Sequence, residues 1–230
     1  AAVLSLASCT TTKFVPDGSY LLDEVKIRTD QKNIRPSSLR MYVRQNPNAK
    51  WFSLIKTQLY VYNLSGRDST KWGNKFLRRI GDAPVIYSED EAKRSEEEIP
   101  KAVHNMGYMA ATVKRSTKIK KKKIKLYYDV TAGKPYVVQS IKYDIYDPKI
   151  ASLLKQDSAR SLLKEGMYLD VNVLDADRQR ITNKLLRNGY YKFNKDYIGY
   201  TADTVRNTYN VDLTQHLQMY KAHASDSARA

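Results

Sequence analysis

A ten-residue pattern occurs twice in this chain, 82 residues apart, and it constrains the fold more than any other feature. The two copies are Ile99–Tyr108 (IPKAVHNMGY) and Ile181–Tyr190 (ITNKLLRNGY). In each copy, apolar residues at helical spacing end at a Gly-Tyr pair, and two segments that alternate polar and apolar residues follow. Repetition over this distance predicts two domains of one type in tandem.

The Gly-Tyr pairs are interpreted as structural residues. Gly107 and Gly189 stand where a helix should end, and glycine readily adopts the left-handed conformation of such an end. Tyr108 and Tyr190 are expected to pack over the two helix ends.

The pattern of polar and apolar residues predicts the same order of elements in both halves: strand, helix, helix, strand, strand. The expected strands are 20–29, 109–117, 123–130, 136–146, 196–200 and 208–217, and the main helices are 88–106 and 173–188. Shorter helices are expected from residue 36 and near residues 150–163, the latter broken at 156–158. This order predicts an α+β fold, with two helices on one face of each three-stranded sheet.

Residues 47–87 have no counterpart in the second half and are interpreted as an insertion. A short helix is expected over 69–80. The segment is rich in aromatic residues, among them Trp51, Phe52, Trp72 and Phe76. The simpler interpretation is a small internal core, and the alternative is an exposed patch that contacts a partner.

The N-terminus resembles a bacterial lipobox. An apolar run ends in Leu6-Ala7-Ser8-Cys9, and Cys9 is the only cysteine. Small residues before the cysteine suit a signal peptidase. Residues 1–8 are therefore expected to be the remainder of a signal peptide and residues 9–18 a leader lipidated at Cys9. The alternative is a short buried segment in which the cysteine is a small apolar residue.

The chain carries a large excess of positive charge. It has 40 Lys and Arg against 24 Asp and Glu, a formal net charge of +16. Such a chain favours anionic partners: nucleic acid, lipid headgroups or acidic proteins. A single cysteine excludes an intramolecular disulfide, and no run of 18 apolar residues is present to span a membrane as a helix.

Six lysines gather around the turn expected between 109–117 and 123–130: Lys118, Lys120, Lys121, Lys122, Lys123 and Lys125. They could contact anionic headgroups or an acidic partner. The alternative is a solvated turn whose charges discourage aggregation. Nucleic acid is a rival partner, because six tyrosines on or beside the strands could stack on bases: Tyr127, Tyr128, Tyr190, Tyr191, Tyr197 and Tyr200.

The sequence offers no catalytic constellation. His104, His216 and His223 lack metal-ligand spacing, and neither a phosphate-binding loop nor a nucleophile elbow is present. We therefore expect no enzyme activity, cofactor or metal site.

The element order resembles POTRA domains, and three phrases strengthen the resemblance: the Gly-Tyr pairs, Thr131–Tyr136 (TAGKPY) and Lys164–Tyr168 (KEGMY). POTRA repeats precede the outer-membrane β-barrels of the Omp85 group, which includes BamA and TamA. With the lipobox, the chain is most similar to the lipoprotein form of TamA, TamL. The resemblance implies domains at 19–134, with the insertion at 47–87, and 135–220, then a linker at 221–230.

The resemblance also implies a function at the periplasmic face of the outer membrane. Such repeats would bind unfolded outer-membrane proteins or accessory proteins by strand addition, beside the protein's own C-terminal β-barrel and a possible TamB-like partner. Membrane attachment would come from the lipid anchor and the barrel. Two alternatives stay open: an interaction domain of another envelope transporter, and a basic nucleic-acid-binding protein.

Overall fold

The computed structural model describes residues 11–50, 56–206 and 208–217. The chain divides into two compact units, formed by residues 1–101 with 112–131 and by residues 102–111 with 132–230. The expected signal-peptide remainder, Cys9 and the expected linker at 221–230 lie outside the described residues.

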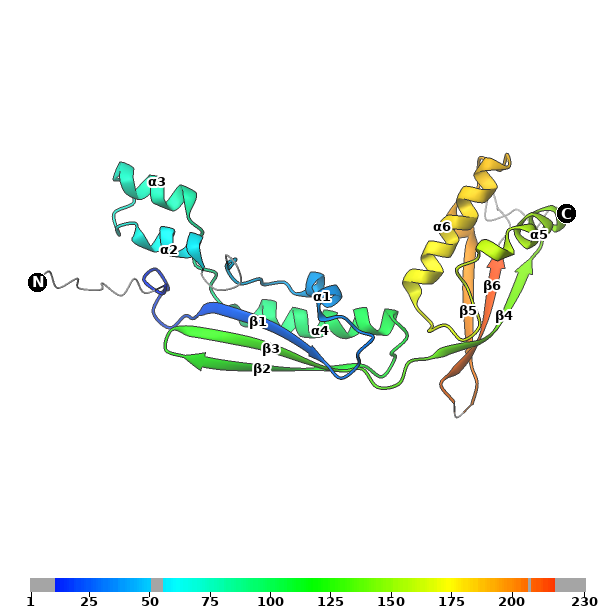
Figure 1. The fold of residues 1–230 in the computed structure, drawn as a ribbon, viewed down its shortest axis with the longest axis horizontal. Coiled ribbons are helices and arrows are strands. Elements are labelled where there is room, and N and C mark those ends of the chain that lie inside the picture. Colours follow the sequence, from blue (N-terminus) through cyan, green and yellow to red (C-terminus); the bar gives the residue numbers. More distant parts are fainter. Residues whose placement is uncertain (1–10, 51–55, 207, 218–230) are drawn as a thin grey trace, which may run out of the picture. The chain divides into compact units, whose positions relative to one another are not determined.

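The first unit contains a three-stranded sheet of order β1-β3-β2 (Figure 1). Its strands are β1 (Leu21–Thr29), β2 (Thr112–Lys120) and β3 (Lys123–Thr131). β1 runs parallel to the central β3, and β2 runs antiparallel to it. Helix α4 (Glu89–Asn105) lies along one face. Tyr128 of β3 is fully buried there, and its hydroxyl donates to the Ala92 carbonyl of α4 at 3.1 Å.

The second unit repeats this topology with order β4-β6-β5. Its strands are β4 (Val137–Ile145), β5 (Ile198–Thr204) and β6 (Asn210–Leu217), and its helices are α5 (Pro148–Gln156) and α6 (Val171–Arg187). Ile150 of α5 and Ile181 and Leu185 of α6 share a core with Ile198 and Leu217. The expected α+β fold with two three-stranded sheets is confirmed.

The repeated Gly-Tyr pairs have the same local geometry. Gly107 and Gly189 have φ angles of +94° and +93°. The following amides turn back onto the helix, with Tyr108 donating to the Val103 carbonyl at 3.3 Å and Tyr190 to the Leu185 carbonyl at 3.1 Å. A side chain would be strained in this left-handed region, so glycine is required at both helix ends.

The first unit differs from the second before α4. Its first helix is one turn, α1 (Pro36–Leu39), followed by a 3₁₀ turn (Arg40–Tyr42). The chain then runs extended and is tied to the start of α4 by Gln45. That side-chain amide donates to the Ser88 carbonyl at 2.6 Å and accepts from the Ser88 amide at 3.0 Å.

The insertion forms two helices, α2 (Thr57–Leu64) and α3 (Trp72–Ile80). The sequence pattern predicted only the second. The interpretation as an internal aromatic core is wrong for Trp72 and Phe76, whose exposed fractions are 83% and 51%. α3 is too short to enclose both rings and has no buried residue. Trp51 and Phe52 lie outside the described residues.

The β2–β3 hairpin is longer than the sequence pattern predicted. β2 continues through Lys120, and the chain reverses at Lys121 and Lys122. The expected strand 109–117 begins and ends three residues too early. Residues 109 and 110 form a turn, and exposed lysines hide the alternation at the other end of the strand.

A buried ion-pair network connects α6 to the turn that follows α5. Asp177 is completely buried and accepts hydrogen bonds from the Leu162 amide at 2.9 Å and from Arg180 Nε at 2.8 Å. Arg180 also donates to Asp157 at 2.5 Å. The acidic partners raise the pKa of Arg180 against the opposing effect of its burial.

Replacing Asp177 with alanine should strongly destabilise the second unit, by about 3 kcal/mol, because the Arg180 charge and the Leu162 amide lose a buried partner. Asp175→Ala is the matched control, since Asp175 lies on the same helix in exposed pairs with Lys195 and Arg178. That change should cost about 0–1 kcal/mol. Urea unfolding followed by circular dichroism measures both, and equal losses would contradict the assignment.

Candidate binding edges and the lysine-rich hairpin

The outer edge of β1 is covered at its start by the insertion. Leu22 donates its amide to the Val85 carbonyl, and the Tyr87 amide donates to the Tyr20 carbonyl, both at 2.8 Å. The buried Lys56 ammonium donates to the Asp23 carbonyl at 2.7 Å and pairs with the Asp23 carboxylate at 3.2 Å. Burial lowers the pKa of Lys56, and Asp23 opposes that shift. This part of β1 therefore has few free backbone groups.

β4 is covered in a similar way. The Val138 amide donates to the Met167 carbonyl at 2.9 Å, and Gly166 donates to the Val138 carbonyl at 2.8 Å. Tyr168 forms an isolated antiparallel bridge with Val137. In both units, the segment just before the long helix hydrogen-bonds to the start of the first strand and covers that part of its edge.

The outer strand of each hairpin is the other sheet edge. In β2, the Arg115 amide points away from β3, because it donates to Glu96 of α4 at 3.1 Å. Amides two and four residues further point the same way in an antiparallel strand. The amides of Thr117 and Ile119 therefore face outward beyond the point that Glu96 covers, and both residues are exposed.

β5 offers a second outer edge. The Val205 amide donates to the Asn210 carbonyl across the hairpin at 3.0 Å. By the same alternation, the amides of Ala202 and Thr204 point away from β6. Both residues are exposed. Unpaired backbone groups of this kind can pair with an added strand.

Arg115 connects β2 to the start of α4. Its guanidinium donates to Glu96 at 3.0 Å, to the Tyr87 hydroxyl at 2.9 Å and to Glu89. The hydrogen bond from Arg115 is the main reason that the pKa of Glu89 falls to about 2. Burial and the bond to Glu89 raise the pKa of Tyr87 to about 12. The network holds the central part of β2 against α4.

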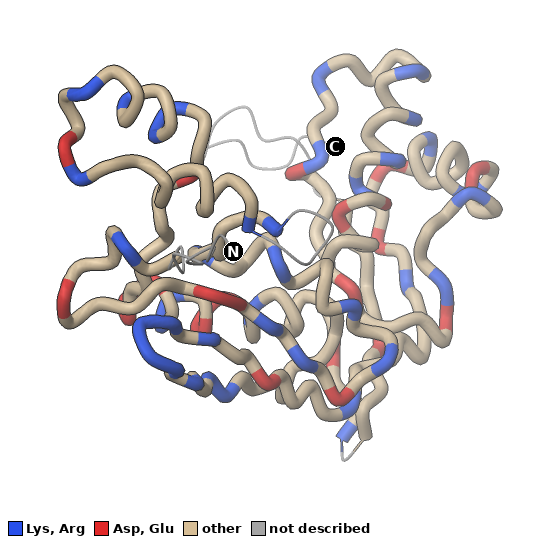
Figure 2. The backbone as a smooth tube through the Cα atoms, turned by 60° about the vertical axis from the view of Figure 1, so that its left-hand side comes forward, with Lys and Arg blue, Asp and Glu red and all other residues tan. Residues whose placement is uncertain are grey.

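The six lysines lie together at the end of the β2–β3 hairpin (Figure 2). Lys122 pairs with Asp17 at 2.6 Å and Lys125 with Glu24 at 3.0 Å. No ion pair of the other four is found among the described residues. All six line an open hollow of about 810 Å³ that Thr11, Thr12 and Tyr60 also line. The lysines thus adjoin the leader and the insertion within the first unit.

Lys121 adopts the left-handed conformation at the tip of this hairpin, with a φ angle of +54°. Asn and Gly are the usual residues for such a two-residue turn. A lysine there carries a conformational cost and keeps another positive charge at the tip.

The tyrosines that could have stacked on bases near this cluster are not available. Tyr128 is fully buried, and Tyr127 is 7% exposed. Arg28 and Lys118 lie over the Tyr127 ring, at 4.5 and 5.8 Å from its centroid. In the second unit, Tyr191 is exposed and the hydroxyl of Tyr200 is buried. Tyr190 and Tyr197 are partly buried.

The two histidines that the structure describes have ordinary hydrogen-bond partners, and His223 lies outside the described residues. His104 lies 3.1 Å from the Ala111 carbonyl, and His216 lies 3.0 Å from an Asp144 oxygen. Within the described ranges, no group of three or more His, Cys, Asp or Glu could hold a metal ion. Nor does any helix there have the length and apolarity to cross a membrane.

Sequence patterns did not identify Lys56, Glu96 or Arg115. Glu96 lies in a run of three glutamates on a helix, and nothing local marks its contact with a strand 19 residues further on. An isolated lysine in an aromatic segment gives no signal that it will be buried. Only the tertiary contacts reveal these edge-covering groups.

Comparison with known proteins agrees with this architecture. Residues 20–133 match the POTRA family model, described as "Surface antigen variable number repeat". No curated protein matches the chain. Residues 20–133 are therefore a POTRA domain, and the second unit has the same strand order and pairing.

Solved structures similar to this chain include POTRA-containing proteins. BamA from Haemophilus ducreyi lacking POTRA domains 1–3 is 17% identical, with a TM-score of 0.40 over 87% of this chain and 30% of that one. POTRA1–2 of Omp85 from Anabaena is 15% identical, with a TM-score of 0.36 over 88% and 98%. The chain thus spans under a third of the length of the Haemophilus ducreyi structure.

The Arg115 network predicts a pH-dependent contribution to stability. Because the pKa of Glu89 is lower in the folded chain than its ordinary 4.5, its contribution is complete above about pH 4.5 and is lost as the pH falls toward about 2. Glu89 is largely exposed, so Glu89→Gln should cost under about 1 kcal/mol at neutral pH.

That cost should shrink as the pH falls toward about 3. Glu97→Gln, an exposed change on the same helix, is the control and should alter stability little at either pH. Thermal midpoints across this range measure the effect, and a Glu89→Gln deficit that grew in acid would have the wrong sign.

Proposed function

We propose that this chain is the periplasmic POTRA region of an outer-membrane protein of the Omp85 group, and that it binds unfolded outer-membrane or accessory proteins by strand addition. β2 and β5 are the receiving edges. The role is one of binding and positioning, without catalysis. A partner strand would form backbone hydrogen bonds that depend little on its sequence, which suits a site that handles many clients.

The observation that carries this proposal is that each unit has one sheet edge covered at its start and one outer edge with exposed residues. Other segments hydrogen-bond to the starts of β1 and β4, whereas β2 and β5 present outward amides at exposed residues. The POTRA match over residues 20–133 supports it independently. A client of alternating polar and apolar residues could place its apolar side chains toward the helix-covered face of the sheet.

The proposal also covers how the protein is attached to the outer membrane. Cys9 would carry the lipid anchor of a TamL-like lipoprotein, and a β-barrel of the same protein would follow in the outer membrane. A TamB-like protein is a further proposed partner, for which no docking residue is identified. An interaction domain of another envelope transporter would use the same edges.

Nucleic-acid binding is the weaker alternative. The hairpin lysines supply positive charge, but the adjacent aromatic rings are buried or covered by Arg28 and Lys118. Single-stranded binding usually combines a basic groove with stacking platforms. The exposed Tyr191 belongs to the other unit.

Proline substitutions at the two edges test strand addition directly. Thr117→Pro and Ala202→Pro each remove an outward amide while keeping the hairpin hydrogen bonds, a setting in which edge strands accept proline. Each should weaken binding of a fluorescent amphipathic β-strand peptide at its own edge by about tenfold, since a hydrogen bond is lost and the ring obstructs approach. Fluorescence anisotropy gives the affinities.

Thr117→Val and Ala202→Val retain the amide and serve as matched controls that should bind as the parent chain does. Thermal unfolding checks that both proline variants stay folded. If the double proline variant is folded and binds the peptide unchanged, strand addition at these edges is wrong. If only one variant is impaired, that unit contains the receiving edge.

Lipidation is tested on the full-length protein in its native cells. We expect the mature chain to begin at Cys9, with an acylated N-terminal peptide recovered from the outer membrane. Mass spectrometry of that peptide measures it, and Cys9→Ser should leave residues 1–8 uncleaved. An unmodified Cys9 with residues 1–8 retained in the soluble fraction would contradict the envelope assignment.

A further inference from the structure

Helix α3 presents a row of apolar side chains to solvent. Trp72, Phe76 and Ile80 follow one another at intervals of four residues, which places them along one side of a helix. Their exposed fractions are 83%, 51% and 49%. The Trp72 and Phe76 rings stack with centroids 6.0 Å apart. Leu64, at the end of α2, is also exposed.

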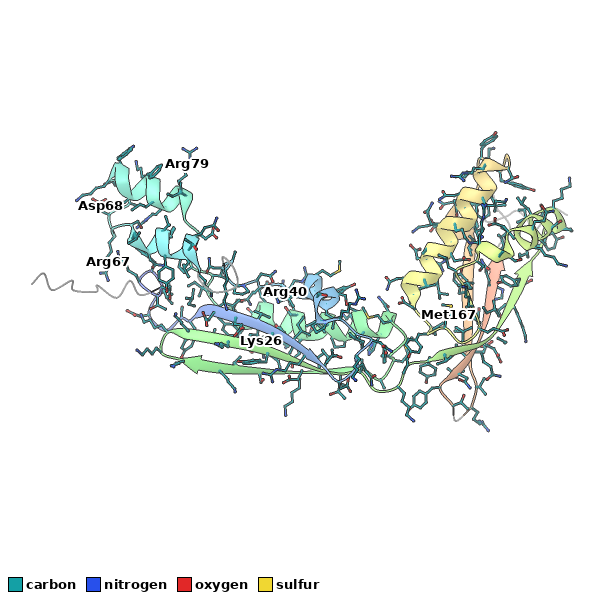
Figure 3. The ribbon with its side chains drawn as sticks, viewed as in Figure 1. Lys26, Arg40, Arg67, Asp68, Arg79 and Met167 are labelled. Carbon is teal, nitrogen blue, oxygen red and sulfur yellow. The ribbon has the colours of Figure 1, made fainter. Side chains whose placement is uncertain are left out.

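Basic residues flank this row. Lys71, Lys75 and Arg79 are exposed, and no ion pair of theirs is found in the described part of the chain. Figure 3 shows Arg67 and Asp68 at the turn between the helices and Arg79 on α3. Asp68 is the only acidic residue between positions 56 and 81. The α3 surface is therefore apolar along one row and positively charged beside it.

Arg78 has a structural role and is excluded from this charged set. Its guanidinium donates to the Gly66 carbonyl at 2.9 Å and lies 5.1 Å from the Phe14 ring centroid. It holds α3 against α2 and the leader. The free cations and the exposed apolar row are thus presented by a supported helix.

The leader is attached directly to this pair of helices. Lys13 donates to the Ser65 carbonyl at 2.6 Å, and Phe14 packs edge-on against Tyr62 of α2, with ring centroids 5.4 Å apart. Val15 is buried in a cluster with Leu59. Thr11 lies two positions after Cys9 in the sequence, a span of at most about 7 Å. Any lipid on Cys9 would therefore keep α2 close to the membrane surface.

We propose that α3 lies in the headgroup region of a phospholipid membrane, with Trp72, Phe76 and Ile80 directed toward the acyl chains and Lys71, Lys75 and Arg79 against anionic phosphates. Helices with one apolar and one basic face lie in this way at membrane surfaces. The charge complementarity and the short tether select a lipid surface as the occupant. The inference deepens the proposed function, because it specifies a second membrane contact beside the anchor.

Tryptophan fluorescence tests the proposal without lipidation. The 230-residue chain with Cys9→Ser and Trp51→Phe retains Trp72 as its only tryptophan. With vesicles of phosphatidylcholine and phosphatidylglycerol, Trp72 emission should shift to shorter wavelength and be quenched by lipids brominated on their acyl chains. With pure phosphatidylcholine the response should be much weaker.

Two charge-reversal variants distinguish a specific contact of α3 from general attraction between the basic chain and an anionic surface. Lys71→Glu/Lys75→Glu/Arg79→Glu should lower the affinity for the anionic vesicles by at least on the order of a hundredfold, since each basic residue near such a surface contributes. Lys118→Glu/Lys120→Glu/Lys121→Glu makes the same charge change on the hairpin and should lower it much less. Circular dichroism confirms that both variants are folded.

Equal losses in the two variants, or bound vesicles that leave Trp72 unquenched, would overturn the proposal. A chain that fails to bind anionic vesicles would also overturn the proposal, and a protein would then be the partner to seek for α3. Because Cys9 is absent from the tested chain and the edge prolines are not involved, these outcomes are independent of the lipidation and strand-addition tests.

Discussion

In each unit the first strand pairs in parallel with the last, and the positions of the other elements depend on this pairing. A parallel pair requires a crossover, so the chain between β1 and β3 must return along one face of the sheet. The helices that cover that face belong to this crossover. The last strand is held between the first strand and its hairpin partner. It contributes fully buried side chains such as Tyr128 and Leu213. The hairpin partner is left as an outer edge in both units.

Charged side chains complete this arrangement where backbone groups would otherwise be unpaired. Lys56 covers the carbonyl of Asp23 at the irregular register of β1, and Glu96 covers the Arg115 amide at the edge of β2. Lys56 and Arg115 thus direct their positive charges to contacts within the first unit. Other cations are exposed, among them Lys118, Lys120, Lys121 and Lys122 at the hairpin tip and Lys71, Lys75 and Arg79 beside the apolar row of α3. They give this unit a surface that favours anionic partners, whereas the two outer strands offer backbone groups that do not discriminate by charge.

The insertion adds contacts to the first unit without changing the order of its three strands. Residues 85–87 add to β1, and α2 binds the leader, so the segment that precedes the POTRA domain becomes part of its structure. The same insertion leaves Trp72 and Phe76 on a surface instead of in a core. A short helix attached through Arg78 and Phe14 can expose these rings, because neighbouring contacts hold it in place.

The sequence by itself determined the element order, the tandem repeat and the helix ends. The order and the repeat follow from local periodicity, and the helix ends follow from glycines in the left-handed backbone conformation. It predicted β1, β4, α4 and α6 to within a few residues, and it predicted the lysine-rich turn, although the charged end of β2 concealed three residues of strand. It did not reveal α2, whose residues Thr57–Leu64 (TQLYVYNL) lack a clear polar face. Only the tertiary structure decided which strand edges are covered, that Lys56 and Asp177 are buried, and that the aromatic residues of α3 are exposed. These properties come from contacts between residues far apart in the chain, and no local pattern specifies such contacts.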